Sequence, residues 1–226
     1  MDLQKHYTDL WESAFKKFSV GEFEQDVLID SVDDNRYGLT LRARPDQTIL
    51  AEFHKFTNNL NEQNAQQYYY PVSDLHITVL SIISCYPGFN LSADNVSAYS
   101  ALIRNIIQDI PCFKVDFKGI TASSSTIMIQ GFPADNSLQR LRDKLRLGFR
   151  SSGLEQTIDK RYIIKTAHST VVRFRSVPAR LPAYLQTLQD YRNYHFGTTN
   201  ISTLELVHND WYHQKANLLG VFNLKD

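Results

Sequence analysis

Five stretches of the chain repeat apolar residues every three or four positions, which is the spacing of one face of an α-helix. The first runs from Leu3 to Phe18, and the second follows Asp46, a residue suited to cap a helix. The third lies between Ser92, another capping residue, and Pro111, which ends a helix. The pattern therefore predicts helices over residues 3–18, 49–60, 96–110, 138–149 and 181–191.

Other stretches alternate apolar and polar residues, the pattern of a half-buried β-strand. Residues 37–44 alternate in this way, as do residues 113–118, and short strands are predicted at 126–130, before His208 and at 218–224. Two further runs, residues 74–83 and 165–174, contain an apolar stretch each and predict buried strands. Each of these two runs follows a predicted strand and a predicted helix.

The order strand, helix, buried strand, helix, strand thus occurs twice. We interpret the chain as an α/β (α+β) protein made of duplicated βαβ-like units. Residues 1–36 are predicted to form a helical extension. Residues 37–226 are predicted to form one domain of two pseudo-symmetric halves, residues 37–120 and 121–226. A duplication of this kind places the two buried strands in equivalent positions about a pseudo-twofold axis.

Both buried strands carry the same short pattern, His76-Ile77-Thr78-Val79 in the first and His168-Ser169-Thr170-Val171 in the second. Successive side chains of a strand point to opposite faces, so the histidine and threonine of each pattern share a face. If the two strands lie together, one imidazole can accept a proton while the other donates one. The threonine hydroxyls are suited to hydrogen-bond phosphoryl oxygens. The pattern predicts a symmetric acid/base site.

Composition narrows the choice of partner. The chain has 226 residues, 42% of them hydrophobic, and equal numbers of basic and acidic residues, 24 of each. A formal net charge of zero argues against long nucleic acid or an anionic membrane and favours a small nucleotide or short oligonucleotide. Leu75 to Cys85, the longest mostly apolar stretch, is too short to span a membrane. With charges throughout Met1 to Val20, no secretion signal is recognised, and a cytoplasmic location is expected.

The two His-x-Thr-x patterns, on strands of a duplicated chain, resemble those of the two-histidine (2H) phosphoesterase superfamily, which includes the LigT-like 2′-5′ RNA ligases and cyclic phosphodiesterases. The resemblance covers about Tyr37 to Leu224. It implies a bilobal fold with a central cleft, and metal-independent hydrolysis of a nucleotide phosphodiester with no cofactor. By motif, it implies that His76 and His168 form the acid/base pair and that Thr78 and Thr170 bind the phosphate.

Further candidates lie near the two motifs. Tyr70 precedes the first motif strand, and Arg161 and Tyr162 lie in the loop before the second, where binding residues are common. Phe174 shares the face of His168 in a regular strand and is predicted to line the cleft. Arg173 falls on the opposite face, which favours a structural role.

Near the C-terminus, His208 and Tyr212 are candidates for substrate contact because family members often carry such residues in this region. Five basic residues of the helix predicted at 138–149 and just beyond it are expected to form a solvated face, since its apolar residues are buried. They are Arg140, Arg142, Lys144, Arg146 and Arg150.

Three alternatives remain open at this point. Two histidines can also shuttle protons at a sugar carbon, as in a mutarotase-like enzyme. A nucleotide-binding or RNA-end-binding module with little turnover is the second. A zinc site is the third, but zinc usually needs three or four His, Cys or carboxylate ligands, and each motif has threonine where a second ligand would sit. No metal ligand is therefore predicted.

Overall fold

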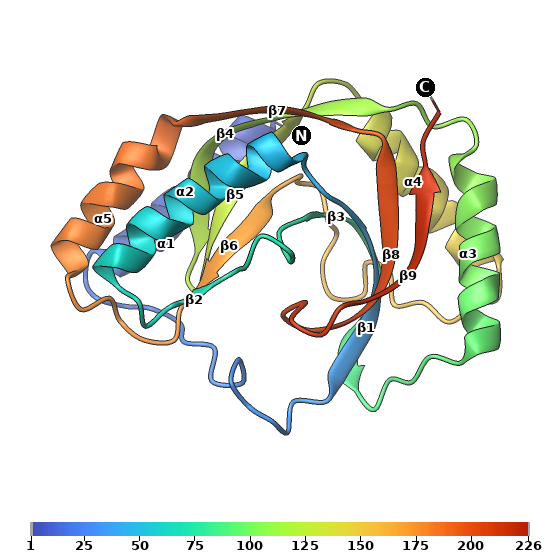
Figure 1. Cartoon of the computed structure of the whole chain (residues 1–226), viewed down its shortest axis with the longest axis horizontal. Helices are drawn as coiled ribbons and strands as arrows, with labels where there is room; N and C mark the ends of the chain where they lie inside the picture. Colours follow the sequence, from blue (N-terminus) through green and yellow to red (C-terminus); the bar gives the residue numbers. More distant parts are fainter. Residues whose placement is uncertain (1, 226) are drawn as a thin grey trace.

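The computed structural model describes residues 2–225 and contains two antiparallel sheets (Figure 1). The first sheet has the strand order β3-β1-β8-β9 and the second β2-β6-β5-β4-β7. The strands of the first sheet are β1 (Arg36–Ala43), β3 (Ile77–Pro87), β8 (Thr203–Asp210) and β9 (Asn217–Asn223). Those of the second are β2 (Tyr68–Tyr69), β4 (Phe113–Ser123), β5 (Thr126–Pro133), β6 (Ser169–Arg173) and β7 (His195–Ile201).

All five predicted helices are present, and they divide between the sheets. In Figure 1, α1 (Leu3–Phe18), α2 (Gln47–Gln63) and α5 (Leu181–Asp190) lie beside the second sheet. The helices α3 (Ala93–Ile107) and α4 (Ser137–Ser151) lie beside the first. A short 3₁₀ helix, Tyr191–Asn193, follows α5. Asp46 and Ser92 cap α2 and α3, as the sequence predicts, by accepting hydrogen bonds from Ile49 N and Asn95 N.

The strand–helix–strand order of each unit is confirmed, but the strands within a unit pair antiparallel, β1 with β3 and β5 with β6. Each sheet also takes strands from both halves of the sequence, since β8 and β9 join β1 and β3, and β4 joins β5 and β6. The two motif strands, β3 and β6, therefore belong to different sheets. They face each other across the space between the lobes instead of lying side by side in one sheet.

Both motif strands contain β-bulges, in which one extra residue is inserted opposite the partner strand. In β3, neighbouring residues of β1 pair with Leu80 and Thr78, so Val79 is the extra residue. In β6, neighbouring residues of β5 pair with Val172 and Thr170, so Val171 is the extra residue. In a regular strand, every second side chain faces the cleft. Across each bulge, the next side chain to face the cleft is instead three residues further on.

The N-terminal segment packs against the second sheet. The Tyr7 side chain of α1 is fully buried and donates a hydrogen bond to Gly131 O at 3.2 Å, while its hydroxyl accepts one from Ala167 N at 3.3 Å. Residues 19–35 then run along the lower side of the view in Figure 1 from α1 to β1. The segment thus connects the two lobes at one end of the space between them.

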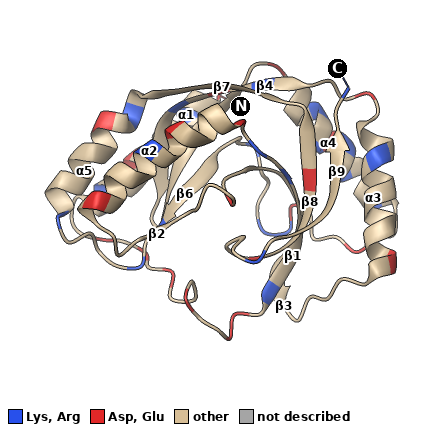
Figure 2. Ribbon diagram, in the orientation of Figure 1, with Lys and Arg blue, Asp and Glu red and all other residues tan. Residues whose placement is uncertain are grey.

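Charged residues of both signs are interspersed over the helices and loops (Figure 2). Among the described residues, no helix combines the length and the apolar character needed to cross a membrane.

Candidate active site

A cleft between the two sheets contains both motif histidines. Its cavity volume is about 140 Å³. The first sheet contributes polar side chains to it, namely Thr40, Thr78, Ser81, Ser84, Cys85 and Asn209, next to His76 at the start of β3. The other side contributes Tyr70, His168, Thr170 and Arg173, and loops add Arg161, Tyr162, Trp211 and His213. The His-x-Thr patterns, separated by many residues in the sequence, thus meet at one site.

The bulges decide which residues follow each motif in the cleft wall. Thr78 is followed there by Ser81 and Ser84, and Thr170 is followed by Arg173. The expectation for the second strand was therefore wrong at two positions. Arg173 lines the cleft, whereas Phe174 is fully buried against Phe18, Phe23 and Tyr184.

The two histidines are oriented through their Nδ1 atoms. His76 Nδ1 lies 2.6 Å from Asp74 O, and because a carbonyl oxygen only accepts, this nitrogen carries the proton. In the neutral ring the lone pair is then on Nε2. His168 Nδ1 lies 2.7 Å from the Thr166 hydroxyl, which is able either to accept or to donate. In both rings Nε2 is the nitrogen left for a ligand in the cleft.

Both imidazoles are held in an environment that favours the neutral form. Burial lowers the pKa of His76 to about 4, with the charge of Arg42 and the neighbouring His168 acting in the same direction. Burial also lowers the pKa of His168 to about 4, assisted by the charge of Arg142. An anion in the cleft would oppose these effects by stabilising an imidazolium.

These pKa values predict that folding stability falls in mild acid. Because each folded pKa of about 4 lies below 6.5, the ordinary value of histidine, the unfolded chain binds more protons than the folded chain between these two pH values. Stability is therefore lost as the pH falls through this window, by roughly 2 kcal/mol per histidine between pH 7 and pH 5. Urea denaturation at the two pH values measures the loss.

The matched control is His54→Gln, at an exposed histidine of α2, which should keep the pH dependence of the wild type. The double variant His76→Gln, His168→Gln should instead make it shallower, and the slope that remains comes from other buried histidines such as His213, whose pKa burial also lowers. An equally steep dependence in the double variant would contradict the assignment to these two groups.

A third imidazole lies against His76. The ring centroids of His76 and His213 are 4.2 Å apart, and His213 occupies the left-handed region of backbone conformation, with φ of 61°. Asn209 Nδ2 lies 3.2 Å from His213 Nε2 and, as an amide NH₂ group, donates to it. Burial lowers the pKa of His213 well below its ordinary value, and His76 adds to the effect. His213 therefore packs as a neutral ring against His76.

One buried arginine connects the two motifs. Arg142, on α4, donates from Nε to Val79 O at 2.9 Å and from Nη2 to Thr78 O at 2.9 Å and Thr166 O at 2.7 Å. Burial lowers its pKa to about 10, so the guanidinium stays charged at neutral pH. The prediction of a fully solvated basic face on α4 is therefore wrong for Arg142, which is 1% exposed, and for Arg146, which is 8% exposed. Both donate to backbone carbonyls near the second motif.

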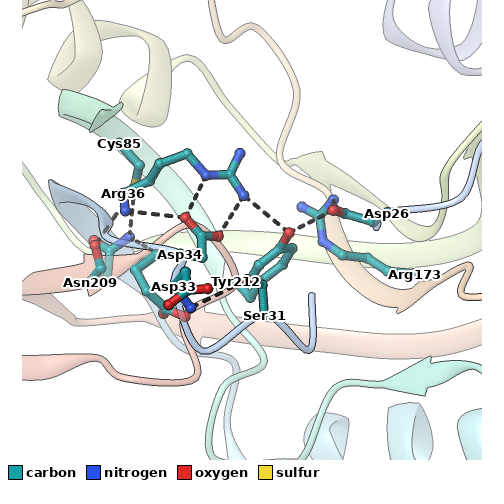
Figure 3. A network of polar contacts seen from close by, with 10 residues as sticks. Asp26, Ser31, Asp33, Asp34, Arg36, Cys85, Arg173, Asn209 and Tyr212 are labelled. Atoms are coloured by element: carbon teal, nitrogen blue, oxygen red, sulfur yellow. Dashed lines mark hydrogen bonds and ion pairs between the residues drawn. The ribbon is translucent and has the colours of Figure 1, made fainter. Parts of the chain in front are cut away.

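Arg173 is held by partners from three parts of the chain, and Figure 3 shows two of them, Asp26 and Tyr212. Its Nε donates to the Tyr70 hydroxyl at 2.8 Å, and its Nη1 lies 3.4 Å from a carboxylate oxygen of Asp26, in the segment between α1 and β1. The Tyr212 hydroxyl donates to Asp26 at 2.6 Å and accepts from Arg36 at 3.1 Å. Arg36 in turn forms a two-point ion pair with Asp34. The network fixes the guanidinium while leaving Nη2 available to a ligand.

The remaining predicted residues divide into three groups. Tyr70, Arg161 and Tyr162 line the cleft together with the motif residues. Tyr212 is buried beside Arg173, whose guanidinium carbon lies 5.4 Å from the Tyr212 ring centroid, and both residues contact Asp26. His208 is outside the cleft, where its ring stacks on Tyr37 with a centroid distance of 5.1 Å and packs against Phe89.

Comparison with solved structures shows the same fold in other proteins. No protein-family model matches the chain, and no curated protein matches it in sequence. The structure of LigT from E. coli with bound 3′-AMP matches with a TM-score of 0.60 and 16% identity, covering 84% of this chain and 99% of LigT. The chain has the LigT-like phosphoesterase fold. Other LigT structures with the same fold contain ATP, NADP+ or phosphate.

Two further structures share the LigT-like fold. Protein TT0787 of Thermus thermophilus matches with a TM-score of 0.59 and 15% identity, covering 83% of this chain and 98% of its own. The conserved protein ATU0111 of Agrobacterium tumefaciens, of unknown function, matches with a TM-score of 0.58 and 15% identity, covering 90% and 97%. The bilobal α+β fold expected from the paired motifs is thereby confirmed.

Proposed function

We propose that this protein hydrolyses a nucleotide phosphodiester, either a 2′,3′-cyclic phosphate or a 2′-5′ linkage, with His76 and His168 as its acid/base pair. The observation that carries the proposal is the meeting of both His-x-Thr motifs and Arg173 in one cleft. E. coli LigT, which has the same fold, is solved with 3′-AMP, and this supports a nucleotide as the ligand.

His76 is the proposed base. Its Nδ1–H donates a hydrogen bond to the Asp74 carbonyl, so the lone pair on Nε2 is free to accept a proton from the attacking water. The water oxygen then forms a bond to phosphorus as the bond to the leaving ribose oxygen breaks.

His168 is the proposed acid. As an imidazolium it donates Nδ1–H to Thr166 and gives the Nε2 proton to the leaving ribose oxygen. Since its pKa in the free protein is about 4, the ring gains this proton most readily together with the anionic substrate. After the reaction His76 carries the proton, and exchange with solvent restores the starting state.

Thr78, Thr170 and Arg173 are the proposed phosphate-binding groups. The two hydroxyls lie two positions after the histidines, and the guanidinium follows Thr170 in the cleft wall because of the bulge. A guanidinium and two hydroxyls stabilise the charge of the non-bridging oxygens as the water attacks. These groups, with the imidazoles, supply every proton transfer and charge contact that the reaction requires.

The test is turnover of a panel of phosphodiesters in EDTA, followed by product chromatography. The panel contains nucleoside 2′,3′-cyclic phosphates, linear 2′-5′ and 3′-5′ dinucleotides, and a cyclic dinucleotide. We expect chelator-insensitive hydrolysis of one class, with 3′-5′ dinucleotides untouched. The double variant His76→Gln, His168→Gln, purified in the same way, is the blank. Absence of turnover across the panel, or equal turnover in the blank, would refute the proposal.

A further inference from the structure

The cleft wall contains two arginines and, within residues 2–225, no aspartate or glutamate. Arg173 is accounted for as a proposed ligand of the scissile phosphate, and its charge is partly balanced by Asp26. Arg161 lies elsewhere in the wall, in the loop between α4 and β6. A second cation in a cleft without acidic groups requires its own explanation.

Arg161 is exposed but held in place by an aromatic ring. Its guanidinium carbon lies 4.3 Å from the ring centroid of Trp211, which is within the range of a cation–π contact. Trp211 also lines the cleft. Stacking on an indole orients a guanidinium while leaving its N–H groups free at the edge, which suits it to bind an oxyanion at two points.

The surroundings of Arg161 leave its charge unbalanced. Arg36 also lies near the Trp211 ring, at 5.1 Å, but it is paired with Asp34 through two nitrogens. No carboxylate of the described residues comes within ion-pairing distance of Arg161. The guanidinium is thus oriented, exposed to the cleft and available to an anion from outside the protein.

Arg161 and Arg173 line one cleft but are held by different partners. The charges of both act on the hydroxyl of Tyr162, another residue of the cleft wall. Arg173 contacts Tyr70, Asp26 and Tyr212, whereas Arg161 contacts Trp211. The partners that hold Arg173 do not hold Arg161, so the N–H groups of Arg161 can bind a second anionic group of a molecule whose first phosphate is bound by Thr170 and Arg173.

We propose that Arg161, stacked on Trp211, forms a subsite for a second phosphate of the substrate, so that the preferred substrate carries a phosphate on the nucleoside next to the scissile phosphodiester. This inference rests on the proposed function and specifies its substrate class. A nucleotide with the scissile group as its only phosphate would leave the subsite empty and bind less tightly.

The test compares compounds that differ only in this phosphate. Adenosine 2′,3′-cyclic phosphate is paired with the same compound carrying a 5′-phosphate, and 2′-5′ diadenylate is paired with its 5′-phosphorylated form. Dissociation constants are measured by calorimetry with His76→Gln, which is expected to bind without turnover, and kcat/KM is measured with the wild-type histidine in place. We expect about tenfold or greater preference for the 5′-phosphorylated member of a pair in both measurements.

Arg161→Gln should remove this preference by weakening the 5′-phosphorylated member of each pair more than its partner. The matched control is Arg104→Gln, since Arg104 lies 5.7 Å from the ring of Phe222 and is also an arginine over an aromatic ring, but one outside the cleft wall. That control should keep the full preference. Trp211→Leu should weaken the preference by releasing Arg161.

Equal affinity for the members of each pair would overturn the subsite, even with hydrolysis established. So would an Arg161→Gln variant that weakens both members equally, which is the result expected if the arginine served the scissile phosphate or folding. A Trp211→Leu variant that weakens both members while Arg161→Gln has no effect would assign Trp211 to base stacking and also overturn it. Phosphate-dependent binding without any turnover would uphold the subsite while refuting the hydrolase proposal.

Discussion

Glutamine in place of either His76 or His168 is expected to lower kcat for the hydrolysed phosphodiester by about 10²- to 10⁴-fold, the usual contribution of a positioned acid or base. Glutamine retains hydrogen-bonding capacity at each site but cannot exchange a proton near neutral pH. Single-turnover kinetics with purified variants measures the loss. The double variant should be only slightly slower than either single variant, because two groups that act in one step are not additive.

The pH profile supplies a second readout. The wild type should show a bell-shaped profile whose limbs belong to the coupled pair. His76→Gln should lose the acidic limb, because the base that must be deprotonated is gone, and His168→Gln should lose the alkaline limb. The control His54→Gln should keep both rate and profile. Retention of the acidic limb in His76→Gln, with loss of the alkaline one, would reverse the assignment of base and acid.

Arg142→Met is expected to destabilise the protein by about 3 kcal/mol, because it leaves three backbone carbonyls in the interior without their donor. The methionine side chain keeps part of the apolar contact, so the effect is mainly one of lost hydrogen bonds. The free energy of unfolding from urea denaturation measures it. Where the variant remains folded at low temperature, kcat should also fall, because the hydrogen bonds that connect β3 to the residues just before β6 are lost.

Arg140→Met is the matched control for this change, at an exposed arginine on the same helix. It should alter the free energy of unfolding by less than about 0.5 kcal/mol. Equal effects of the two substitutions would show that the buried hydrogen bonds of Arg142 contribute no special stability.

Most elements of the fold were predictable because their signals are local. Apolar spacing located the five α-helices, and capping by Asp46 and Ser92 was visible in the sequence, whereas strands β2 and β7 were not predicted as separate elements. The paired His-x-Thr patterns indicated that two distant strands meet. Their meeting across two sheets, instead of within one, depends on strand exchange between the halves, for which no local signal exists.

The cleft residues that follow the second motif were not predictable, because a bulge changes which side chains of a strand face the cleft. Alternation assigns Arg173 to the outer face and Phe174 to the cleft, and the extra residue Val171 reverses both. His213 and Arg142 were missed for a related reason. His213 reaches His76 through a turn with positive φ, and the sequence of α4 does not show that one of its arginines is directed inward to backbone carbonyls.

The three carbonyl hydrogen bonds of Arg142 also bear on how a substrate enters. If the lobes opened as rigid bodies, Thr78 and Val79, on one lobe, would move away from Thr166, next to the other. The buried guanidinium of Arg142 would then lose hydrogen-bond acceptors. That cost opposes hinge motion at the candidate active site. We therefore expect the distance between the two imidazoles to change little when a ligand enters the cleft, whose rim includes the loops that carry Arg161 and Trp211.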